Sequence, residues 1–399
     1  MAWTEARSAA HAAGLAARPG PVSVPLAEAD GLTLAAALTA RTDLPAFPAA
    51  TVDGYAVRGP GPWSVAGRVL AGAVPEPLRA GTAVQVATGA MVPAGTEQII
   101  RAEEARRRPD GRVDGRGRPE REWREPGAEA TCGDELAPAG TPVTPALIGL
   151  AAVCGHDSLP VIPAVRAAVL VFGDELLTAG LPGRGRVRDG LGPQLPGWLR
   201  RLGALPAAGF APLGPVPDSL TAQASALEAA LAHADLVCTA GGTMRGPVDH
   251  LRPALAALGG RYVVDRVAVR PGFPMVLAEV PAPDGRPRFV AGLPGNPQSA
   301  IAALVSLVAP LLRGLAGRPE PPLPTARLAE RVPGRGTFAR LVPVRVERGV
   351  AEPVGHTGAA MLRGLAGSDG FAVIPPGTDG EAGAGVRWAP LPLLPGQRP

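Results

Sequence analysis

Acidic side chains stand close to glycine-rich segments in the second half of the chain. Asp174 and Glu175 directly follow Gly173. Asp218 lies in a proline-rich segment, and Asp249 comes shortly after a Gly-Gly pair. Glycine lets the backbone approach a phosphate closely, whereas carboxylates repel phosphates unless a cation lies between them. Mg²⁺ held by carboxylates and by substrate phosphates would satisfy both groups, so the pattern predicts a site that cleaves or forms a phosphoanhydride.

The same residues also have purely structural interpretations. An acid such as Asp249 is common near the start of a helix, and an acid such as Asp218 is common in a turn. A single Gly-Gly pair is most often a tight turn. On the residues alone, the catalytic and the structural interpretations both stay open.

Two residues of types that the chain almost lacks stand in similar segments. Asn296 is the only asparagine in the chain and lies between Gly295 and Pro297. Its side-chain amide can donate and accept hydrogen bonds at once. Tyr55 is one of two tyrosines and follows Asp53-Gly54. Their retention in so biased a composition indicates functional positions.

Three continuous apolar runs must position these residues. They cover 165–172, 235–239 and 289–291, and each ends in a glycine-containing loop; the second and third are followed by helical patterns over 248–258 and from Ser299. Such runs alternating with helices predict a largely parallel sheet covered on both faces. Ligands bind outside the carboxyl ends of such strands, so we expect the three loops to converge. The helix starts there would offer free backbone N–H groups to an anion.

The remaining chain has a different texture. Residues 1–42 are rich in Ala and Leu at helical spacing, and from Asp43 the sequence predicts short strands, such as 63–69 and 83–87. The mixed-charge run 106–125 is typical of a solvated loop or hairpin, and its acids argue against nucleic-acid binding. After Pro319, alternating strands at 341–347, 371–374 and 386–391 predict a small β domain.

Composition excludes several classes of protein. All 39 residues of the Lys+Arg count are arginines, so P-loop, kinase and pyridoxal chemistry, which need a lysine, are absent. The three cysteines form no C-x-x-C pair, which fits a reducing cytoplasm and no zinc site. The longest apolar stretch, 299–312, is too short to span a bilayer, and we expect no signal peptide. The sequence therefore predicts a cytoplasmic protein that binds neither membrane nor nucleic acid.

Six motifs in order resemble those of the molybdopterin molybdenumtransferase family, which includes MoeA and the gephyrin E domain. Residues 51–57 (Thr-Val-Asp-Gly-Tyr-Ala-Val) are similar to the family's S-A-M-D-G-Y-A-V, and 88–95 to its T-G-A-x-V-P-x-G. The segments 173–176, 241–243, 270–274 and 292–300 follow in the family's order. The resemblance runs from about residue 5 to the C-terminus.

The resemblance implies a fold, a reaction and partners. The fold is an α/β molybdopterin-binding domain, with a mostly parallel sheet and helices on both faces, within a multidomain α+β protein. The implied domains are 1–42 with 139–163 (elongated), 43–138 (β-rich), 164–318 (α/β) and 319–399 (β-barrel-like). The reaction joins molybdate to adenylylated molybdopterin and releases AMP with Mg²⁺. The implied partners are a second copy, in a homodimer with a shared active site, and other molybdenum-cofactor assembly proteins.

Site residues carry over by motif. The catalytic carboxylates are Asp53, Glu135, Glu175, Asp218 and Asp249, with Glu175, Asp218 and Asp249 as metal ligands. At 133–135 the family usually has Gly-x-Asp, and here Glu135 takes the acid's place. Substrate and anion contacts are expected from Thr88, Gly89, Gly173, Asp174, Gly241, Gly242, Thr243, Arg270, Pro271, Gly272, Pro294, Gly295, Asn296, Pro297, Ser299 and Arg340. Of these, Arg270, Ser299 and Arg340 are the candidates for binding molybdate, a tetrahedral dianion.

The chain departs from the family pattern where anions are expected. The family's K-P-G-K-P is Arg-Pro-Gly-Phe-Pro at 270–274, so Phe273 replaces a lysine. Met244 and Ala359 stand where the family has serines. These losses motivate an alternative: a weakened paralogue that binds molybdopterin or a partner protein without inserting metal. A third hypothesis, an unrelated nucleotide-binding α/β enzyme, would make the Asp53-Gly54-Tyr55 motif a coincidence.

Overall fold

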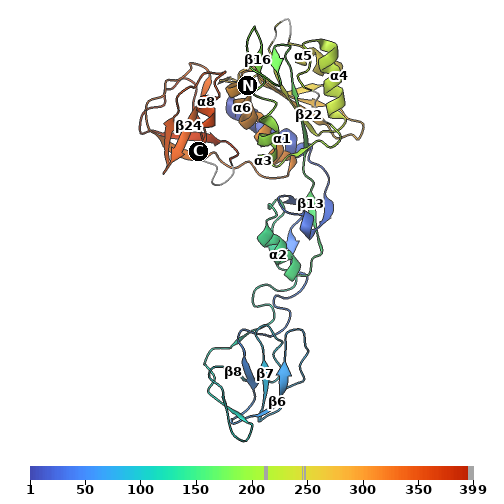
Figure 1. The fold of residues 1–399 in the computed structure, drawn as a ribbon, viewed down its shortest axis with the longest axis vertical. Coiled ribbons are helices and arrows are strands. Elements are labelled where there is room, and N and C mark those ends of the chain that lie inside the picture. Colours follow the sequence, from blue (N-terminus) through green and yellow to red (C-terminus); the bar gives the residue numbers. More distant parts are fainter. Residues whose placement is uncertain (211–213, 245, 247–248, 394–399) are drawn as a thin grey trace. The chain divides into compact units, whose positions relative to one another are not determined.

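The computed structural model describes residues 1–210, 214–244, 246 and 249–393, which form two compact units (Figure 1). Unit 1 comprises residues 1–22, 31–35 and 162–399, and unit 2 comprises residues 23–30 and 36–161. This division groups residues 1–22 with the α/β region. The boundaries of the four expected domains stay a prediction.

The sheet of unit 1 has the order β17-β14-β18-β22-β21-β19. Its strands are β14 (Arg166–Val171), β17 (Leu205–Pro206), β18 (Leu236–Ala240), β19 (Arg261–Asp265), β21 (Val276–Val280) and β22 (Arg288–Leu293). The first four in sheet order pair in parallel, with Val169 opposite Cys238 and Cys238 opposite Ala291. β21 and β19 add antiparallel. The three apolar runs of the sequence are therefore neighbouring parallel strands, as predicted.

Helices cover both faces of this sheet (Figure 1). Alternate residues of each strand belong to different cores, because successive side chains of a strand point to opposite faces. Val169 and Cys238 pack with α1 (Trp3–Ala16), α3 (Leu195–Arg201) and the helical run 297–315. Leu170 and Val237 pack with α4 (Leu220–Leu231) and α5 (Leu251–Ala257). The predicted doubly covered sheet is confirmed.

The helical run 297–315 consists of α6 (Pro297–Ala303), a π-helical segment η2 (Leu304–Val308) and α7 (Ala309–Leu315). It is long and apolar enough to cross a membrane, but 89% of an 18-residue stretch within it is buried. Its residues from Ala300 to Leu315 are largely part of the unit 1 core. We therefore interpret it as a core helix.

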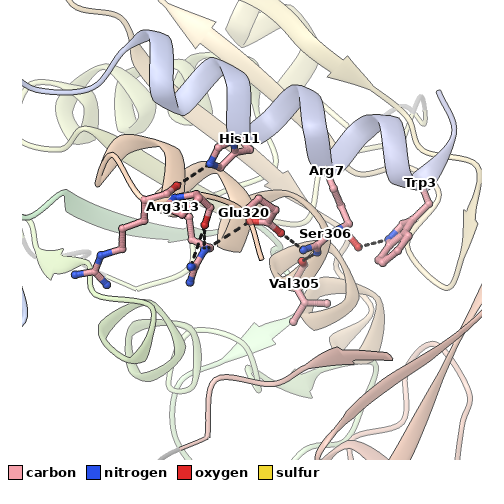
Figure 2. Close-up of polar contacts among 9 residues, drawn as sticks. Trp3, Arg7, His11, Val305, Ser306, Arg313 and Glu320 are labelled. Atoms are coloured by element: carbon pink, nitrogen blue, oxygen red, sulfur yellow. Dashed lines mark hydrogen bonds and ion pairs between the residues drawn. The ribbon is translucent and has the colours of Figure 1, made fainter. Parts of the chain in front are cut away.

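Helix α1 is anchored to this run through polar side chains (Figure 2). Trp3 Nε1 donates to Ser306 Oγ at 2.8 Å, and Arg7 donates to the Val305 carbonyl oxygen. Arg7 also forms an ion pair with Glu320. Both the Ser306 hydroxyl and the Val305 carbonyl lie in η2, where the π-helical turn changes the regular backbone pairing.

The expectation of helical structure across residues 1–42 is wrong beyond Ala16. The segment that follows is Arg-Pro-Gly-Pro at 18–21, and proline removes the N–H that a helix needs. After it come β1 (Val22–Pro25), a 3-10 turn η1 (Leu26–Glu28), β2 (Thr33–Leu34) and β3 (Leu38–Thr39). The Ala and Leu residues of this segment contribute to packing, although they do not form a helix.

The C-terminal strands of unit 1 form a small barrel. They are β23 (Thr325–Leu328), β24 (Ala339–Glu347), β25 (Val350–Pro353), β26 (Gly370–Ile374) and β27 (Gly385–Pro390). β24 pairs with both β25 and β26, which closes the ring. β20 (Val269–Arg270) joins β24 in parallel and so connects the barrel to the α/β region. Unit 1 also contains β15 (Leu176–Leu177), β16 (Val187–Arg188) and α8 (Arg363–Ala366).

Unit 2 is mostly β structure, as predicted. Its four-stranded sheet has the order β6-β7-β5-β8, formed by β5 (Gly54–Val57), β6 (Ser64–Val69), β7 (Thr82–Val86) and β8 (Gln98–Arg101). Its other elements are β4 (Ala49–Ala50), β9 (Arg106–Arg107), β10 (Val113–Asp114), β11 (Trp123–Arg124), β12 (Glu135–Ala137), α2 (Pro145–Val153) and β13 (Ser158–Ile162). The charged run 106–125 contains the β9–β10 hairpin, in which Arg108 pairs with Asp114, so the hairpin prediction is confirmed.

Candidate active site

The loops after β14, β18 and β22 meet around one cavity of about 880 Å³ in unit 1. A Cβ placed on Gly295 would lie only 3.6 Å from the Cα of Gly241, so two of these loops are in contact. Gly241 and Gly242 have φ angles of +99° and +67°, which glycine adopts without strain. The convergence expected from the parallel strands is confirmed.

Most predicted site residues of unit 1 line this cavity. They are Gly173, Glu175, Asp218, Gly241, Gly242, Thr243, Asp249, Arg270, Pro271, Gly272, Pro294, Gly295, Asn296, Pro297 and Ser299. Arg340 is absent from this lining, and so is Asp174, which contacts Asp218 instead. Met244 and Ala359, the two positions without the family's hydroxyl, also line it.

Asp174 and Asp218 hold two loops together. The Asp174 N–H donates to Asp218 Oδ2 at 3.3 Å, and the Asp218 N–H donates to Asp174 Oδ1 at 3.4 Å. The buried Gln223 donates from Nε2 to Asp218 Oδ1 at 3.4 Å. Asp218 therefore lines the cavity while it stabilises the loop geometry, so the turn role and the site role coexist.

Glu175 is placed by the backbone of Gly173. A Cβ at Gly173 would lie 2.6 Å from Glu175 Oε2, and the φ angle of Gly173 is +146°. A residue with a side chain would therefore displace the carboxylate. The Glu175 carboxylate makes no hydrogen bond or ion pair within the described part of the chain, so its oxygens are available to a ligand.

Asp249 folds the loop that follows β18. Its two carboxylate oxygens accept hydrogen bonds from the N–H groups of Met244, at 3.3 Å, and Gly246, at 2.7 Å. The N-cap residue of α5 is His250, so Asp249 precedes the cap position and does not cap the helix. The predicted helix start at Val248 lies outside the described residues.

The expectation of free N–H groups at the start of α6 is wrong for two of them. The N–H groups of Gln298 and Ser299 donate to the Ala359 carbonyl oxygen at 3.0 and 3.2 Å. Gln298 Nε2 also donates to the Thr357 carbonyl oxygen at 3.1 Å. The barrel loop thus occupies these donors, whereas Asn296 is exposed and its side chain makes no cap hydrogen bond.

A second cavity of about 380 Å³ contains three arginines and no acidic residue in its lining. Arg270 lines both cavities, and Arg335 and Arg340 line only the second. Arg270 on β20 is in register with Arg340 on β24, so the two side chains occupy neighbouring positions of a parallel pair. Burial and the nearby charge of Arg335 both lower the pKa of Arg340. Such a set of cations favours an anionic ligand.

The carboxylates of the larger cavity are of the chemical type that Mg²⁺ binds. This ion prefers oxygen ligands and keeps water molecules and phosphates in its coordination shell. Among the described residues, no group of three or more His, Cys, Asp or Glu side chains lies close enough to hold a metal alone. One or two carboxylates with substrate phosphates would suffice. The roles of Glu175, Asp218 and Asp249 as metal ligands stay a prediction.

In unit 2, Asp53 is exposed at the start of β5. Its Oδ1 accepts hydrogen bonds from Thr88 N at 2.6 Å and Thr88 Oγ1 at 2.8 Å, which lower the pKa of the carboxyl. Gly89 follows with a φ of +79°. A Cβ on Gly54 would overlap the Ile100 carbonyl oxygen, which explains the glycine.

Glu135 is exposed at the start of β12. Its neighbour Asp134 accepts a hydrogen bond from the Thr131 N–H at 2.7 Å, and this bond lowers the pKa of Asp134. Asp134 therefore stabilises the turn in which it lies. The Glu135 carboxylate accepts no hydrogen bond within the described part of unit 2, and its role as the functional acid stays a prediction.

Sequence reasoning missed Arg188, which lines the larger cavity, and Arg335, which lines the smaller one. Arg188 comes from the short strand β16 and carries no recognisable signal. Arg335 begins a tight turn before β24, and Gly336 in that turn has a φ of +59°. The sequence could have indicated Arg335, because it lies next to a turn glycine and only five residues before the predicted anion ligand Arg340.

Comparison with known proteins agrees with this architecture over most of the chain. Three family descriptions match: "MoeA N-terminal region (domain I and II)" at residues 1–155, "Probable molybdopterin binding domain" at 168–314 and "MoeA C-terminal region (domain IV)" at 325–391. The chain is 31% identical to molybdopterin molybdenumtransferase 2 of Mycobacterium tuberculosis, over 89% of this chain and 91% of that protein. It is 28% identical to molybdopterin molybdenumtransferase of Bacillus subtilis, over 89% and 86%.

A solved structure, the molybdopterin biosynthesis MoeA protein from Pyrococcus horikoshii, is also similar. It superposes with a TM-score of 0.80 at 26% identity and covers 98% of this chain and 99% of that one. The sheet, the loops around its cavity and the closed barrel thus define a multidomain protein of the molybdopterin-binding class. The chain belongs to the molybdopterin molybdenumtransferase family.

Proposed function

We propose that this protein acts in molybdenum cofactor biosynthesis and transfers molybdate into adenylylated molybdopterin, with release of AMP. The observation that carries the proposal is the distribution of acidic side chains between two adjoining cavities. The larger cavity contains Glu175, Asp218 and Asp249 together with two arginines, whereas the lining of the smaller one contains three arginines and no acid. A dianion such as molybdate is repelled by carboxylates and attracted by guanidinium groups.

The larger cavity suits the pterin phosphate and the nucleotide. Its glycine loops let backbone N–H groups approach phosphates, and Asn296 offers both a donor and an acceptor. Glu175, Asp218 and Asp249 would hold Mg²⁺, which would neutralise charge on the pyrophosphate. Asp53 and Glu135 are exposed carboxylates of unit 2 that we assign to the same reaction by their motifs.

The smaller cavity suits molybdate. Arg270 lies at its boundary with the larger cavity, and Arg335 and Arg340 line it from the barrel side. Guanidinium groups bind tetrahedral oxyanions through paired hydrogen bonds, so three of them can compensate the missing lysines. We also propose a cytoplasmic homodimer that exchanges substrate with other molybdenum-cofactor assembly proteins.

The direct test measures AMP release from adenylylated molybdopterin in the presence of Mg²⁺ and molybdate. Glu175→Ala and Asp249→Ala should each reduce the rate at least 100-fold, by the usual cost of removing a group that stabilises charge in the transition state (about 3 kcal/mol). Glu228→Ala, which removes an exposed acid on α4, is the matched control and should keep the wild-type rate. Full activity of Glu175→Ala or Asp249→Ala would refute its assigned role.

The alternative function gives a different result in the same assay. The absence of hydroxyls at Met244 and Ala359 in the larger cavity favours a paralogue that binds molybdopterin without inserting metal. Such a protein would bind molybdopterin, but molybdate would not stimulate AMP release. Molybdate-stimulated AMP release excludes this alternative.

A further inference from the structure

Two phenylalanine rings enclose the guanidinium group of Arg270. Its Cζ atom lies 5.0 Å from the ring centroid of Phe273 and 4.7 Å from that of Phe338. Both distances are within the range of cation–π attraction, about 6 Å. The two rings contact each other edge to face, with centroids 5.5 Å apart and an interplanar angle of 79°. The three side chains thus form one closed cluster.

This cluster is assembled from two separate segments. Phe273 follows the turn Pro271-Gly272, and Phe338 lies two residues before Arg340 at the start of β24. Within the turn, the Met275 N–H donates to the Gly272 carbonyl oxygen at 3.0 Å, and the Phe273 carbonyl oxygen accepts from the Val267 N–H at 3.1 Å. The backbone of Phe273 is therefore held by its own turn, whereas Phe338 directly precedes β24 of the barrel.

The rings orient Arg270 without using its hydrogen-bond donors. The guanidinium makes no hydrogen bond or ion pair with any residue in the described ranges, although it lines both cavities. A carboxylate partner would have fixed the side chain but would have neutralised its charge and occupied its N–H groups. Contact with a ring face leaves the charge and the N–H groups to a ligand.

We propose that Phe273 and Phe338 are positioning residues that hold the Arg270 guanidinium at the junction of the two cavities for an oxyanion. This inference rests on the proposed function and deepens it. It also changes the interpretation of Phe273, because the sequence alone indicates only that a lysine of the family pattern is missing there. If Phe273 positions Arg270, restoring a lysine at this position weakens oxyanion binding; if Phe273 is only a lost charge, the lysine strengthens it.

The test is molybdate binding to the full-length protein without pterin, measured by equilibrium dialysis. Phe273→Leu should weaken binding about tenfold, the typical worth of a partly desolvated cation–π contact, and Phe273→Lys should weaken it as well. Phe273→Trp, which keeps a ring face, should bind within about twofold of the wild type. Phe47→Leu removes an exposed phenylalanine of unit 2 and is the control, expected to have no effect.

The outcomes separate this inference from the proposed function. Tighter binding by Phe273→Lys, or unchanged binding by Phe273→Leu, overturns the positioning role while molybdate binding by the wild type stands. A wild-type protein that binds no molybdate overturns both proposals.

Two further readouts distinguish positioning from general structural support. In the AMP-release assay, Phe273→Leu should raise the KM for molybdate about tenfold and leave kcat within about twofold, because saturating molybdate restores occupancy. Adding Phe273→Leu to Arg270→Met should cause no further loss of binding, since the ring then has no cation to hold. An additive loss in the double variant, or an equal fall in kcat, contradicts the proposal.

Discussion

The ion pair between Arg7 and Glu320 should be a main anchor of helix α1. The two side chains are only 12% and 23% exposed, and Arg7 also donates to the Val305 carbonyl oxygen and lies 5.2 Å from the Trp3 ring centroid (Figure 2). Burial lowers the pKa of Arg7, which Glu320 partly opposes. Removing the arginine therefore leaves a largely buried carboxylate without its principal partner.

Arg7→Leu should reduce the free energy of unfolding of unit 1 by about 3 kcal/mol, the lower part of the range for breaking a buried pair, because both groups retain some solvent. That loss corresponds to a fall in Tm of about 5–10 °C for a unit of this size. Differential scanning calorimetry and urea unfolding would measure it. The double variant Arg7→Leu/Glu320→Gln should recover part of the loss, because it removes the buried charge.

A surface arginine with two acidic partners provides the matched control. Arg331 pairs with Asp379 and Glu381 in the barrel of the same unit, and the three side chains are 59%, 35% and 65% exposed. Exposed pairs contribute little, so Arg331→Leu should change the free energy of unfolding by less than about 1 kcal/mol. If Arg7→Leu costs no more than Arg331→Leu, the reasoning from burial is wrong for the Arg7–Glu320 pair.

Two other predictions concern unit 2. Gly54→Ala should destabilise unit 2 by about 3 kcal/mol in urea unfolding, because its Cβ would overlap the Ile100 carbonyl oxygen; Gly67→Ala, which meets nothing within 4 Å, should be tolerated. Thr88→Val should raise the pKa of Asp53 in an NMR titration, because one of the hydrogen bonds that lower it is lost, and the carboxyl would then protonate at higher pH. Thr88→Ser should keep the low pKa, and an unshifted titration in Thr88→Val would contradict this cause.

The parallel core of the fold was predictable from sequence because each strand is a continuous apolar run that stops at a glycine. The run before Gly173 and the run before Gly241 both ended where expected. Residues 17–42 were not predictable in the same way, because Ala and Leu favour a helix by composition while Pro19 and Pro21 interrupt it. Local proline chemistry outweighed average propensity.

The candidate site shows where sequence reasoning ends. Its acids and glycines were identified because they follow strand ends. The hydrogen bonds from the α6 N–H groups to the Ala359 carbonyl oxygen could not be identified from the sequence, because Ala359 is some sixty residues away in another domain. Nor could the contact of Phe273 with Phe338 be foreseen, since it depends on how β20 joins β24. Long-range pairing determined both, and no local pattern encodes it.

The in-register arrangement of Arg270 and Arg340 has a consequence for domain cohesion. β20 is the strand by which the α/β region joins the barrel, and it places two arginines at paired backbone positions of that seam. Like charges on neighbouring strands repel, and a bound oxyanion would offset that repulsion. An oxyanion that binds between them would stabilise the pairing of β20 with β24. A ligand that binds only the paired state adds a stabilisation that grows with the logarithm of its concentration. If the proposed function holds, substrate binding would thereby be linked to the docking of the barrel through the paired Arg270 and Arg340.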